Sequence, residues 1–258
     1  MLEKKTIIID NREIEYLERR NNGPMILFLP GISGTHNAWT RVIDKLEKRF
    51  SIISISLPPY SKGNDLMSLP KLVKKFLDAL NIDKAILVGH SLGGLIAIRM
   101  SAMFPERIQK MVIVSSPLPD IEKRNLIKNI VPRFTNIKNI DKLTRYYGNH
   151  ENLINNLARF LDYSQDSEKK MNKEEWNKLV CCIIDVVNHP WVEDIGKISS
   201  SVLIIYGDED RALVFFGGTE LYSKFKDVII LKIGGDHRLP RNKSSELALI
   251  INGFICGL

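Results

Sequence analysis

The chain has 258 residues, 44% of them hydrophobic and 26% charged, which is the composition of an ordinary globular protein. No apolar run reaches the roughly 18 residues that span a bilayer, so we expect no transmembrane segment. The formal net charge is +7, but Lys and Arg are spread along the chain without an aromatic–basic motif, so we expect no nucleic-acid partner.

The cysteines and the N-terminus favour a reducing compartment. The N-terminal residues contain no apolar signal core and no cleavage motif, so we expect no export signal. Three cysteines, two of them adjacent (Cys181 and Cys182), indicate neither a disulfide framework nor a metal site. We therefore predict a cytoplasmic protein. Neither a P-loop nor a G-x-G-x-x-G motif occurs, so we expect no nucleotide cofactor.

The first part of the chain alternates between strand and helix patterns. Residues 6–10 and 13–19 are predicted to be strands joined by a turn at Asn11 and Arg12, with one face of the second strand in water. The apolar run 25–29 is typical of a strand buried on both faces, and Pro30-Gly31-Ile32-Ser33-Gly34 follows it. The next predicted elements are a helix at 39–48, strand 51–57, helix 69–80, strand 85–88, helix 95–103 and strand 111–114.

The most informative stretch is Gly89-His90-Ser91-Leu92-Gly93, which fits the pattern G-x-S-x-G between a predicted strand and a predicted helix. A turn this tight strains the backbone of the serine and presses the flanking residues together. Glycine at both flanking positions avoids the Cβ clash. The helix that follows directs the positive end of its dipole towards the serine. The pattern therefore predicts a nucleophilic serine at residue 91.

From residue 118 to about 190 the buried strand runs disappear. Helical patterns occupy 125–130, 137–147, 151–160 and 173–187, with a polar connector at 164–170. After this segment we predict a strand at 201–206, a helix at 217–225, a strand at 228–233 and a helix at 244–256. We interpret 118–190 as a helical insertion into a core made of 1–117 and 191–258. Buried strands that alternate with helices predict an α/β protein with a mainly parallel sheet.

Candidate catalytic groups follow four of the predicted strands. They are Pro30-Gly31-Ile32, Ser91, Asp208-Glu209-Asp210 and Gly234-Gly235-Asp236-His237. Because ligands bind at the carboxyl ends of parallel strands, a serine, an acid and a histidine on separate loops are expected to converge in one cleft.

With these motifs the sequence resembles the α/β-hydrolases over nearly its whole length, and the chain order Ser91, Asp210, His237 is that of the family. The resemblance implies an α/β-hydrolase fold in which the insertion 118–190 is a cap. It implies that Ser91 attacks a carbonyl, that His237 is the general base and that Asp210 orients it. The backbone N–H groups of Ile32 and Leu92 would hold the oxyanion, without metal or cofactor.

Some assignments leave alternatives. Asp210 has the family's spacing from Gly207, whereas Asp208 is a nearby rival and Asp120 a more distant one. The other histidines and Ser33 have expected roles outside the chemistry. His36 is a candidate for lining the pocket, His90 for packing on the sheet, His150 and His189 for surface or core packing, and Ser33 for shaping the loop. Pro30 replaces the family's usual histidine, and Arg211 stands where a proline often follows the acid.

The insertion suggests a substrate preference. Between 123 and 145 it has seven basic residues and one acid, Asp141, interleaved with apolar residues. One interpretation is a set of helices with a solvated basic face; the other is a lid that covers an acyl chain, favours anionic lipid or an acidic substrate, and allows weak membrane-surface contact. The expected substrate is a small ester or acyl compound. A thioesterase, a lactonase, a carbon–carbon bond hydrolase or a non-catalytic ligand receptor would share these residues.

Overall fold

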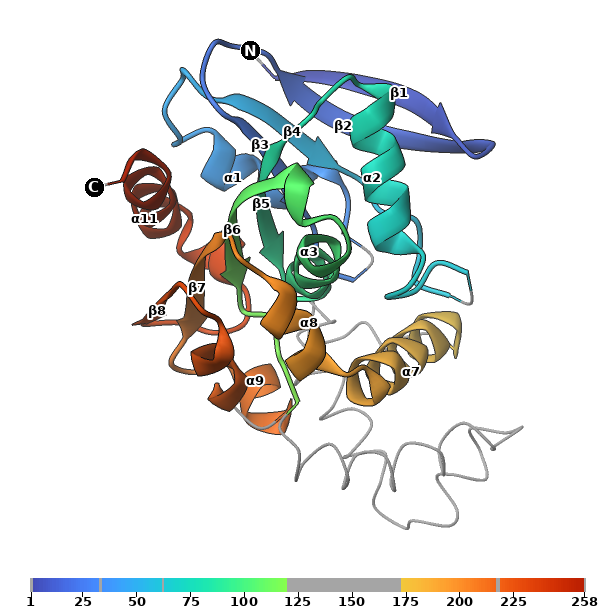
Figure 1. Ribbon diagram of the computed structural model, residues 1–258, viewed down its shortest axis with the longest axis vertical. Coiled ribbons are helices and arrows are strands. Elements are labelled where there is room, and N and C mark those ends of the chain that lie inside the picture. The colour runs from blue at the N-terminus through green and yellow to red at the C-terminus, as the bar shows by residue number, and fades with distance from the viewer. Residues whose placement is uncertain (1, 33, 62, 120–172, 217–218, 258) are drawn as a thin grey trace.

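The computed structural model describes residues 2–32, 34–61, 63–119, 173–216 and 219–257, and within them eight strands form one sheet (Figure 1). The strand order across the sheet is β1-β2-β4-β3-β5-β6-β7-β8. The strands are β1 (Glu3–Ile9), β2 (Arg12–Arg19), β3 (Met25–Leu29), β4 (Ser51–Ile55), β5 (Ala85–His90), β6 (Ile108–Val114), β7 (Ser201–Gly207) and β8 (Val228–Ile233).

The sheet is mainly parallel, as the sequence predicts. Strand β2 runs antiparallel to β1 and β4, and every other neighbouring pair is parallel. Strands β3 and β4 are buried on both faces, because their apolar runs lie between helical layers. All the carboxyl ends of the six parallel strands therefore point to the same edge of the sheet.

The first hairpin differs from its prediction in two respects. Ile9 pairs with Arg12, so the turn consists of Asp10 and Asn11, one residue earlier than predicted. Both turn residues have positive φ angles, 49° and 60°, a conformation that Asp and Asn tolerate better than most residues. The solvent-exposed face predicted for β2 is confirmed only in the first half of the strand, because Glu18 in the second half is buried in ion pairs with Lys5 and Arg20.

Helices cover both faces of the sheet. Figure 1 shows α2, α3 and α8 on one side and α1 and α11 on the other. The helices are η1 (His36–Trp39), α1 (Thr40–Ile43), α2 (Leu69–Ala79), α3 (Leu92–Met103), η2 (Pro105–Arg107), α7 (Lys173–Asn188), α8 (Trp191–Lys197), α9 (Arg211–Phe216), η3 (Glu220–Lys224), α10 (Leu239–Asn242) and α11 (Ser244–Cys256). None of these helices is long and apolar enough to cross a membrane.

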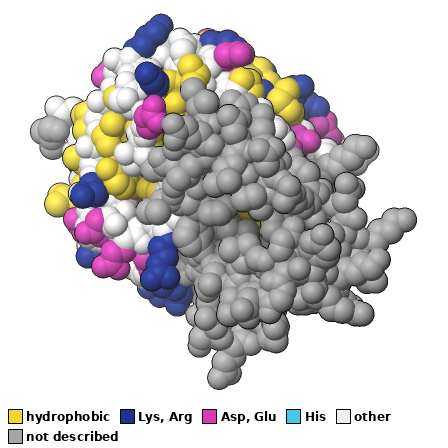
Figure 2. All heavy atoms as spheres, turned by 90° about the horizontal axis from the view of Figure 1, so that it is seen from below, with side chains coloured by type: hydrophobic (Ala, Val, Ile, Leu, Met, Phe, Trp, Pro, Cys, Tyr) yellow, Lys and Arg dark blue, Asp and Glu magenta, His cyan; other side chains and the backbone are white. Residues whose placement is uncertain are grey.

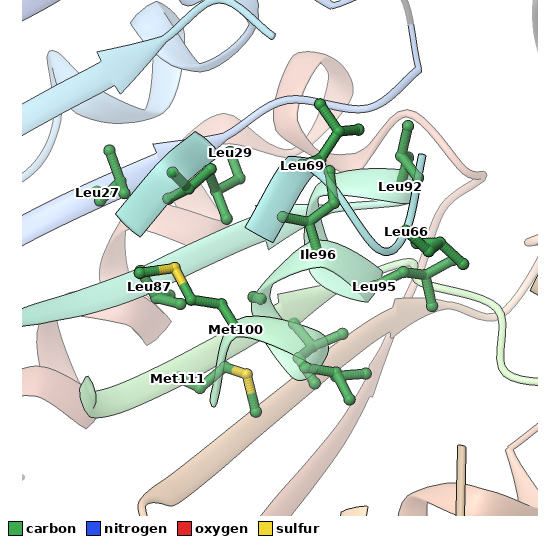
Figure 3. Close-up of a cluster of buried hydrophobic side chains, with 14 of the residues drawn as sticks. Leu27, Leu29, Leu66, Leu69, Leu87, Leu92, Leu95, Ile96, Met100 and Met111 are labelled. Carbon is green, nitrogen blue, oxygen red and sulfur yellow. The ribbon is translucent and has the colours of Figure 1, made fainter. Parts of the chain in front are cut away.

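The larger hydrophobic core lies between the sheet and α2 and α3, and Figure 3 shows its centre. Side chains from β3 and β5, such as Leu29 and Leu87, meet Ile96 and Met100 of α3, and all four are fully buried. This packing fixes α3 against the sheet. Because α3 follows Ser91 directly, the core also fixes the position of the predicted nucleophile.

Three predicted helices have different bounds in the structure. The helix predicted at 39–48 is α1 and ends at Ile43, where Lys45 Nζ and Lys48 Nζ bond to the carbonyls of Arg41 and Asp44. The helix predicted at 95–103 begins earlier, at Leu92. The helix predicted at 217–225 is wrong: α9 precedes it, and residues 220–224 form a 3₁₀ helix. Two short helices, α8 and α10, lie in stretches where no helix is predicted.

Most of the predicted insertion lies outside the described residues. This holds for the helices predicted at 125–130, 137–147 and 151–160, the connector 164–170, the basic stretch 123–145, Asp120 and His150. Ser33 is also outside them. The last helix predicted in the insertion, 173–187, is present as α7.

Two buried polar contacts attach α7 and α8 to the core. Tyr60 Oη donates a 2.6 Å hydrogen bond to Asp185 of α7. Arg99 of α3 binds both carboxylate oxygens of Asp194 of α8, at 2.9 and 2.8 Å, and His189 Nε2 lies 2.6 Å from the same carboxylate. The buried Asp194 is thus held by two partners, which links α8 to the helix behind Ser91.

Candidate active site

Ser91 occupies a strained turn between β5 and α3. Its φ and ψ angles are 51° and −119°, a backbone conformation with positive φ that few residues other than glycine adopt. A Cβ at Gly89 would lie 2.4 Å from the carbonyl oxygen of Gly93, and a Cβ at Gly93 would lie 2.3 Å from that of Leu29. Only glycine fits at either position, which confirms the steric reading of the G-x-S-x-G pattern.

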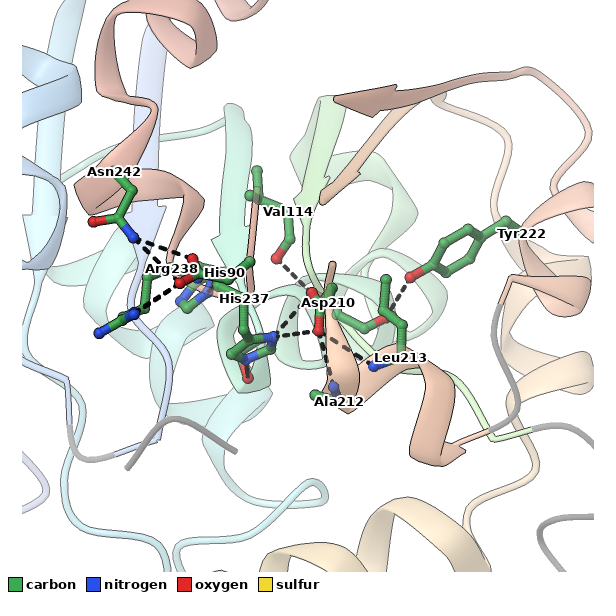
Figure 4. A network of polar contacts seen from close by, with 12 residues as sticks. His90, Val114, Asp210, Ala212, Leu213, Tyr222, His237, Arg238 and Asn242 are labelled. Atoms are coloured by element: carbon green, nitrogen blue, oxygen red, sulfur yellow. Dashed lines mark hydrogen bonds and ion pairs between the residues drawn. The ribbon is translucent and has the colours of Figure 1, made fainter. Parts of the chain in front are cut away.

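The structure brings Ser91, His237 and Asp210 together at the carboxyl edge of the sheet. Figure 4 shows His237 beside Asp210. His237 Nε2 lies 3.0 Å from Ser91 Oγ. His237 Nδ1 lies 3.1 and 3.0 Å from the two carboxylate oxygens of Asp210. Because an ionised carboxylate only accepts hydrogen bonds, Nδ1 carries the proton and the Nε2 lone pair faces the serine hydroxyl. This is the tautomer in which the imidazole can take the proton of Ser91.

Asp210 lies in an environment that keeps it ionised. The residue is only 2% exposed, and one carboxylate oxygen accepts the backbone N–H groups of Ala212 and Leu213 at the start of α9. Burial alone raises the pKa of Asp210, but the hydrogen bonds from His237 and from the N–H of Leu213 outweigh it, so the pKa is lowered. The buried carboxylate thus carries a negative charge beside His237 at neutral pH.

The rival acid, Asp208, has a different function. Its carboxylate is exposed and accepts the N–H of Gly235 at 2.9 Å, which fastens the end of β7 to the loop that carries His237. The two segments touch so closely that a Cβ at Gly207 would lie 2.1 Å from the carbonyl oxygen of Gly235. Asp208 therefore shapes the histidine loop, while Asp210 contacts the imidazole itself.

A second polar network holds the histidine loop from the other side. Asp236 accepts the backbone N–H of Arg238 at 2.9 Å and its guanidinium at 2.8 Å, and the Asn242 amide donates to the same carboxylate at 3.1 Å. Figure 4 shows Arg238 and Asn242 on the side of His237 away from Asp210. The network ties the loop to α10, and the sequence motif contained Asp236 without indicating this role.

The predicted oxyanion donors border the site. Ile32 lines the same pocket as Ser91. Leu92 is the first residue of α3, and the first N–H groups of a helix have no partner within the helix. Ser91, by contrast, has its own N–H bonded to the carbonyl of Val114 at 2.9 Å, which fixes the backbone of the turn. The N–H of Leu92 is thus at the positive end of the α3 dipole.

The remaining described histidines act as structural groups. His90 packs beside the rings of Trp39 and His237, and its Nε2 donates to the His237 carbonyl oxygen at 2.8 Å. Burial lowers the pKa of His90 to about 4, so the ring is neutral at pH 7. His36 is buried against Ser56 and does not line the pocket, contrary to the prediction. His189 is a core residue, as predicted.

One supporting residue has no signal in the sequence. Tyr222 of η3 is fully buried, and its hydroxyl donates to the carbonyl of Ser116 at 2.9 Å (Figure 4). This bond connects the segment after α9 to the loop after β6. Burial and the nearby charge of Asp210 raise the pKa of Tyr222, so the hydroxyl stays a donor. The sequence predicts an ordinary helix here, and a single tyrosine within it does not indicate a hydrogen bond to the loop after β6.

A pocket of about 370 Å³ opens on Ser91 and His237. Its described walls come from the loop after β3, from η1 and α1, and from α10. Over the described ranges, no cluster of three or more His, Cys, Asp or Glu side chains is placed to hold a metal ion.

Comparisons with known proteins agree with this architecture. The model of a protein family described as the alpha/beta hydrolase fold matches residues 24–229. The chain is 22% identical to the uncharacterized hydrolase YugF of Bacillus subtilis over 96% of both chains. It is 33% identical to a pimeloyl-[acyl-carrier protein] methyl ester esterase of Nitrosomonas europaea, over 39% of this chain and 40% of that one.

A solved structure supports the same fold. The epoxide hydrolase VrEH1 of Vigna radiata superposes with a TM-score of 0.71 at 17% identity, covering 100% of this chain and 98% of that one. At such identity the likeness concerns the fold alone. Because the family model covers most of the sequence, the chain belongs to the α/β-hydrolase family.

Proposed function

We propose that this protein is a serine hydrolase that cleaves a carboxylic ester through an acyl-enzyme intermediate. The observation that carries the proposal is the continuous hydrogen-bonded path from Ser91 Oγ through His237 to Asp210, with bonds of 3.0 Å at both nitrogens of the imidazole. A free serine hydroxyl is a weak nucleophile, and an imidazole at this distance and in this tautomer is the base that activates it.

The reaction has two halves. His237 takes the proton of Ser91 as the hydroxyl oxygen attacks the ester carbonyl, and it returns that proton to the leaving alcohol. Water then enters, gives its proton to His237 and attacks the acyl-enzyme, which releases the acid and restores Ser91. Asp210 stabilises the imidazolium in both halves. The N–H groups of Ile32 and Leu92 bind the oxyanion, and the loss of one such donor costs about 3 kcal/mol.

Thioesters and lactones would react at the same three residues, because each offers a carbonyl and a leaving group to the serine. The esterase name of the Nitrosomonas relative favours an oxygen ester as the first candidate. A non-catalytic receptor would have no use for the base tautomer of His237. We also propose that 118–190 is a cap on the core 1–117 and 191–258, supported by the contacts of Asp185 with Tyr60 and of His189 with Asp194, each of which joins this segment to that core. Location in the cytoplasm and weak membrane-surface contact stay predictions.

The test compares Ser91→Ala with the wild type on p-nitrophenyl butanoate, an N-acetylcysteamine thioester and γ-butyrolactone. We expect ester hydrolysis by the wild type and a loss of at least about 10³-fold in Ser91→Ala. Ser116→Ala is the matched control, because Ser116 follows the neighbouring strand β6 and its hydroxyl bonds only a backbone carbonyl. Turnover that survives in Ser91→Ala, or a wild type that binds these compounds without turnover, would contradict the proposal.

A further inference from the structure

The pocket at Ser91 has a basic side that belongs to the core and not to the insertion. Arg41, Arg238 and Arg241 line the same pocket as Ser91 and His237. Arg41 comes from α1, whereas Arg238 directly precedes α10 and Arg241 lies in its last turn. Helices α1 and α10 are in contact, and Arg41 Nη1 lies 3.5 Å from the carbonyl oxygen of Arg241. Three arginines are therefore gathered at the entrance to one site.

Two of these three positive charges have no acidic partner among the described residues. Asp236 neutralises Arg238 at 2.8 Å. Within the part of the chain that the structure describes, neither Arg41 nor Arg241 forms an ion pair, and no Asp or Glu lines the pocket. Arg41 and Arg241 are both exposed at the pocket, so their guanidinium groups are available to a ligand.

This excess of one sign differs from the general surface. On the face seen in Figure 2, basic and acidic side chains are interspersed over the described residues. Some basic residues elsewhere are paired with an acid, as Lys74 is with Asp78 and Lys75 with Asp10. A concave site lined by charges of one sign raises the local concentration of the opposite sign. Arginine in particular binds carboxylates and phosphates through two parallel hydrogen bonds.

We propose that the substrate of this site carries an anionic group, a carboxylate or a phosphate, that Arg41 and Arg241 bind while its ester lies at Ser91. The inference rests on the proposed ester hydrolysis and adds the substrate class. It places the anion in the pocket between α1 and α10, on the core side of the site, independently of any contribution from the insertion. The two arginines act as specificity-determining residues, since they contact the substrate away from the reacting carbonyl.

The test compares esters of equal chain length that differ only in charge. The p-nitrophenyl half-ester of glutaric acid is the carboxylate probe, p-nitrophenyl 4-phosphonobutanoate is the phosphonate probe, and p-nitrophenyl pentanoate is the neutral one. We expect the wild type to prefer at least one anionic ester by about tenfold or more in kcat/KM at low salt, and the preference to shrink in 0.5 M NaCl. The larger of the two preferences identifies which anion the site is built for.

The variants Arg41→Glu and Arg241→Glu should each lower the ratio of anionic to neutral kcat/KM by about tenfold, and the double variant should abolish or invert it. Lys48→Glu is the matched control. It changes the net charge equally on an exposed residue just beyond α1 that does not line the pocket, and its ratio should stay that of the wild type. Thermal unfolding of each variant checks that the fold is intact.

The outcomes separate this inference from the proposed function. A wild type that hydrolyses pentanoate through Ser91 with no preference for either anionic ester would overturn the inference and leave the esterase proposal intact. If no ester is hydrolysed, calorimetric titration of the Ser91→Ala protein with monomethyl glutarate and with methyl 4-phosphonobutanoate decides. Binding that disappears in Arg41→Glu/Arg241→Glu supports an anion site in a protein that is not an esterase, and absence of binding overturns both proposals.

Discussion

The replacement Asp210→Asn tests the acid of the proposed triad and its distinction from Asp208. The asparagine oxygen can keep the hydrogen bonds from Ala212 and Leu213, so α9 keeps its cap and the fold should survive. The negative charge beside His237 is lost, however. A charge-assisted hydrogen bond of this kind is worth roughly 1.5–3 kcal/mol, or about 10- to 150-fold in rate.

The change also acts on the tautomer of His237. An asparagine amide can turn its N–H towards Nδ1, which moves the imidazole proton to Nε2 and leaves no lone pair for Ser91. Together the two effects should lower kcat for p-nitrophenyl butanoate on the order of 10⁴-fold. KM should change little, because Asp210 is buried behind His237 and does not line the pocket.

Asp208→Asn is the matched control, because it makes the same chemical change two residues away in the same loop. Its oxygen can still accept the N–H of Gly235, so we expect kcat within about threefold of the wild type. Steady-state kinetics at pH 7, with thermal unfolding to confirm folding, provide the comparison. If Asp208→Asn loses more activity than Asp210→Asn, or Asp210→Asn loses less than about tenfold, the assignment of the acid is refuted.

Three further predictions concern the framework of the site. Gly93→Ala should destabilise the protein by about 3 kcal/mol or more, because its Cβ would lie 2.3 Å from the Leu29 carbonyl oxygen. Gly253→Ala in α11, where a Cβ would have nothing within 4 Å, should instead stabilise the protein by about 0.5–1 kcal/mol. Equal urea midpoints for the two variants would contradict this prediction. Asp194→Ala should cost about 3–5 kcal/mol in unfolding free energy, since it leaves the buried Arg99 guanidinium unpaired; a loss below 1 kcal/mol would show that the pair is dispensable. The pKa of His90 in the folded protein is about 4, below its ordinary value of 6.5, so the unfolded chain takes up the proton first as the pH falls. The free energy of unfolding should therefore decrease as the pH drops from 6.5 to 4. The urea midpoint of His90→Gln should decrease less than that of the wild type over this window, and an equal decrease would show that His90 is not the cause.

The sequence predicts best the elements whose apolar residues lie between clear turn residues. Strands β3 and β8 and helix α11 occupy their predicted residues, because continuous apolar runs between turn residues have few alternative structures. The G-x-S-x-G turn is predictable for a steric reason that a short stretch contains, since Gly89 and Gly93 touch backbone atoms directly. Such local constraints do not depend on distant contacts.

The features that the sequence does not predict depend on tertiary contacts. Helix α9 starts directly after Asp210, whose carboxylate caps it and also contacts His237 of a distant loop. The bond from His90 to the carbonyl of His237 joins residues 147 positions apart, and no local pattern marks it. The proximity of Arg41 and Arg241 could not be predicted from the sequence either, because α10 is only four residues long and has no hydrophobic periodicity.

The most direct test of the central claim is covalent labelling of Ser91 by a fluorophosphonate, followed by mass spectrometry of tryptic peptides. Trypsin releases the segment from Ala85 to Arg99, in which Ser91 is the only serine. We expect stoichiometric phosphonylation of this peptide at pH 7, and markedly slower labelling in Asp210→Asn. An unlabelled peptide in folded wild-type protein, or a label on another residue, would contradict the account.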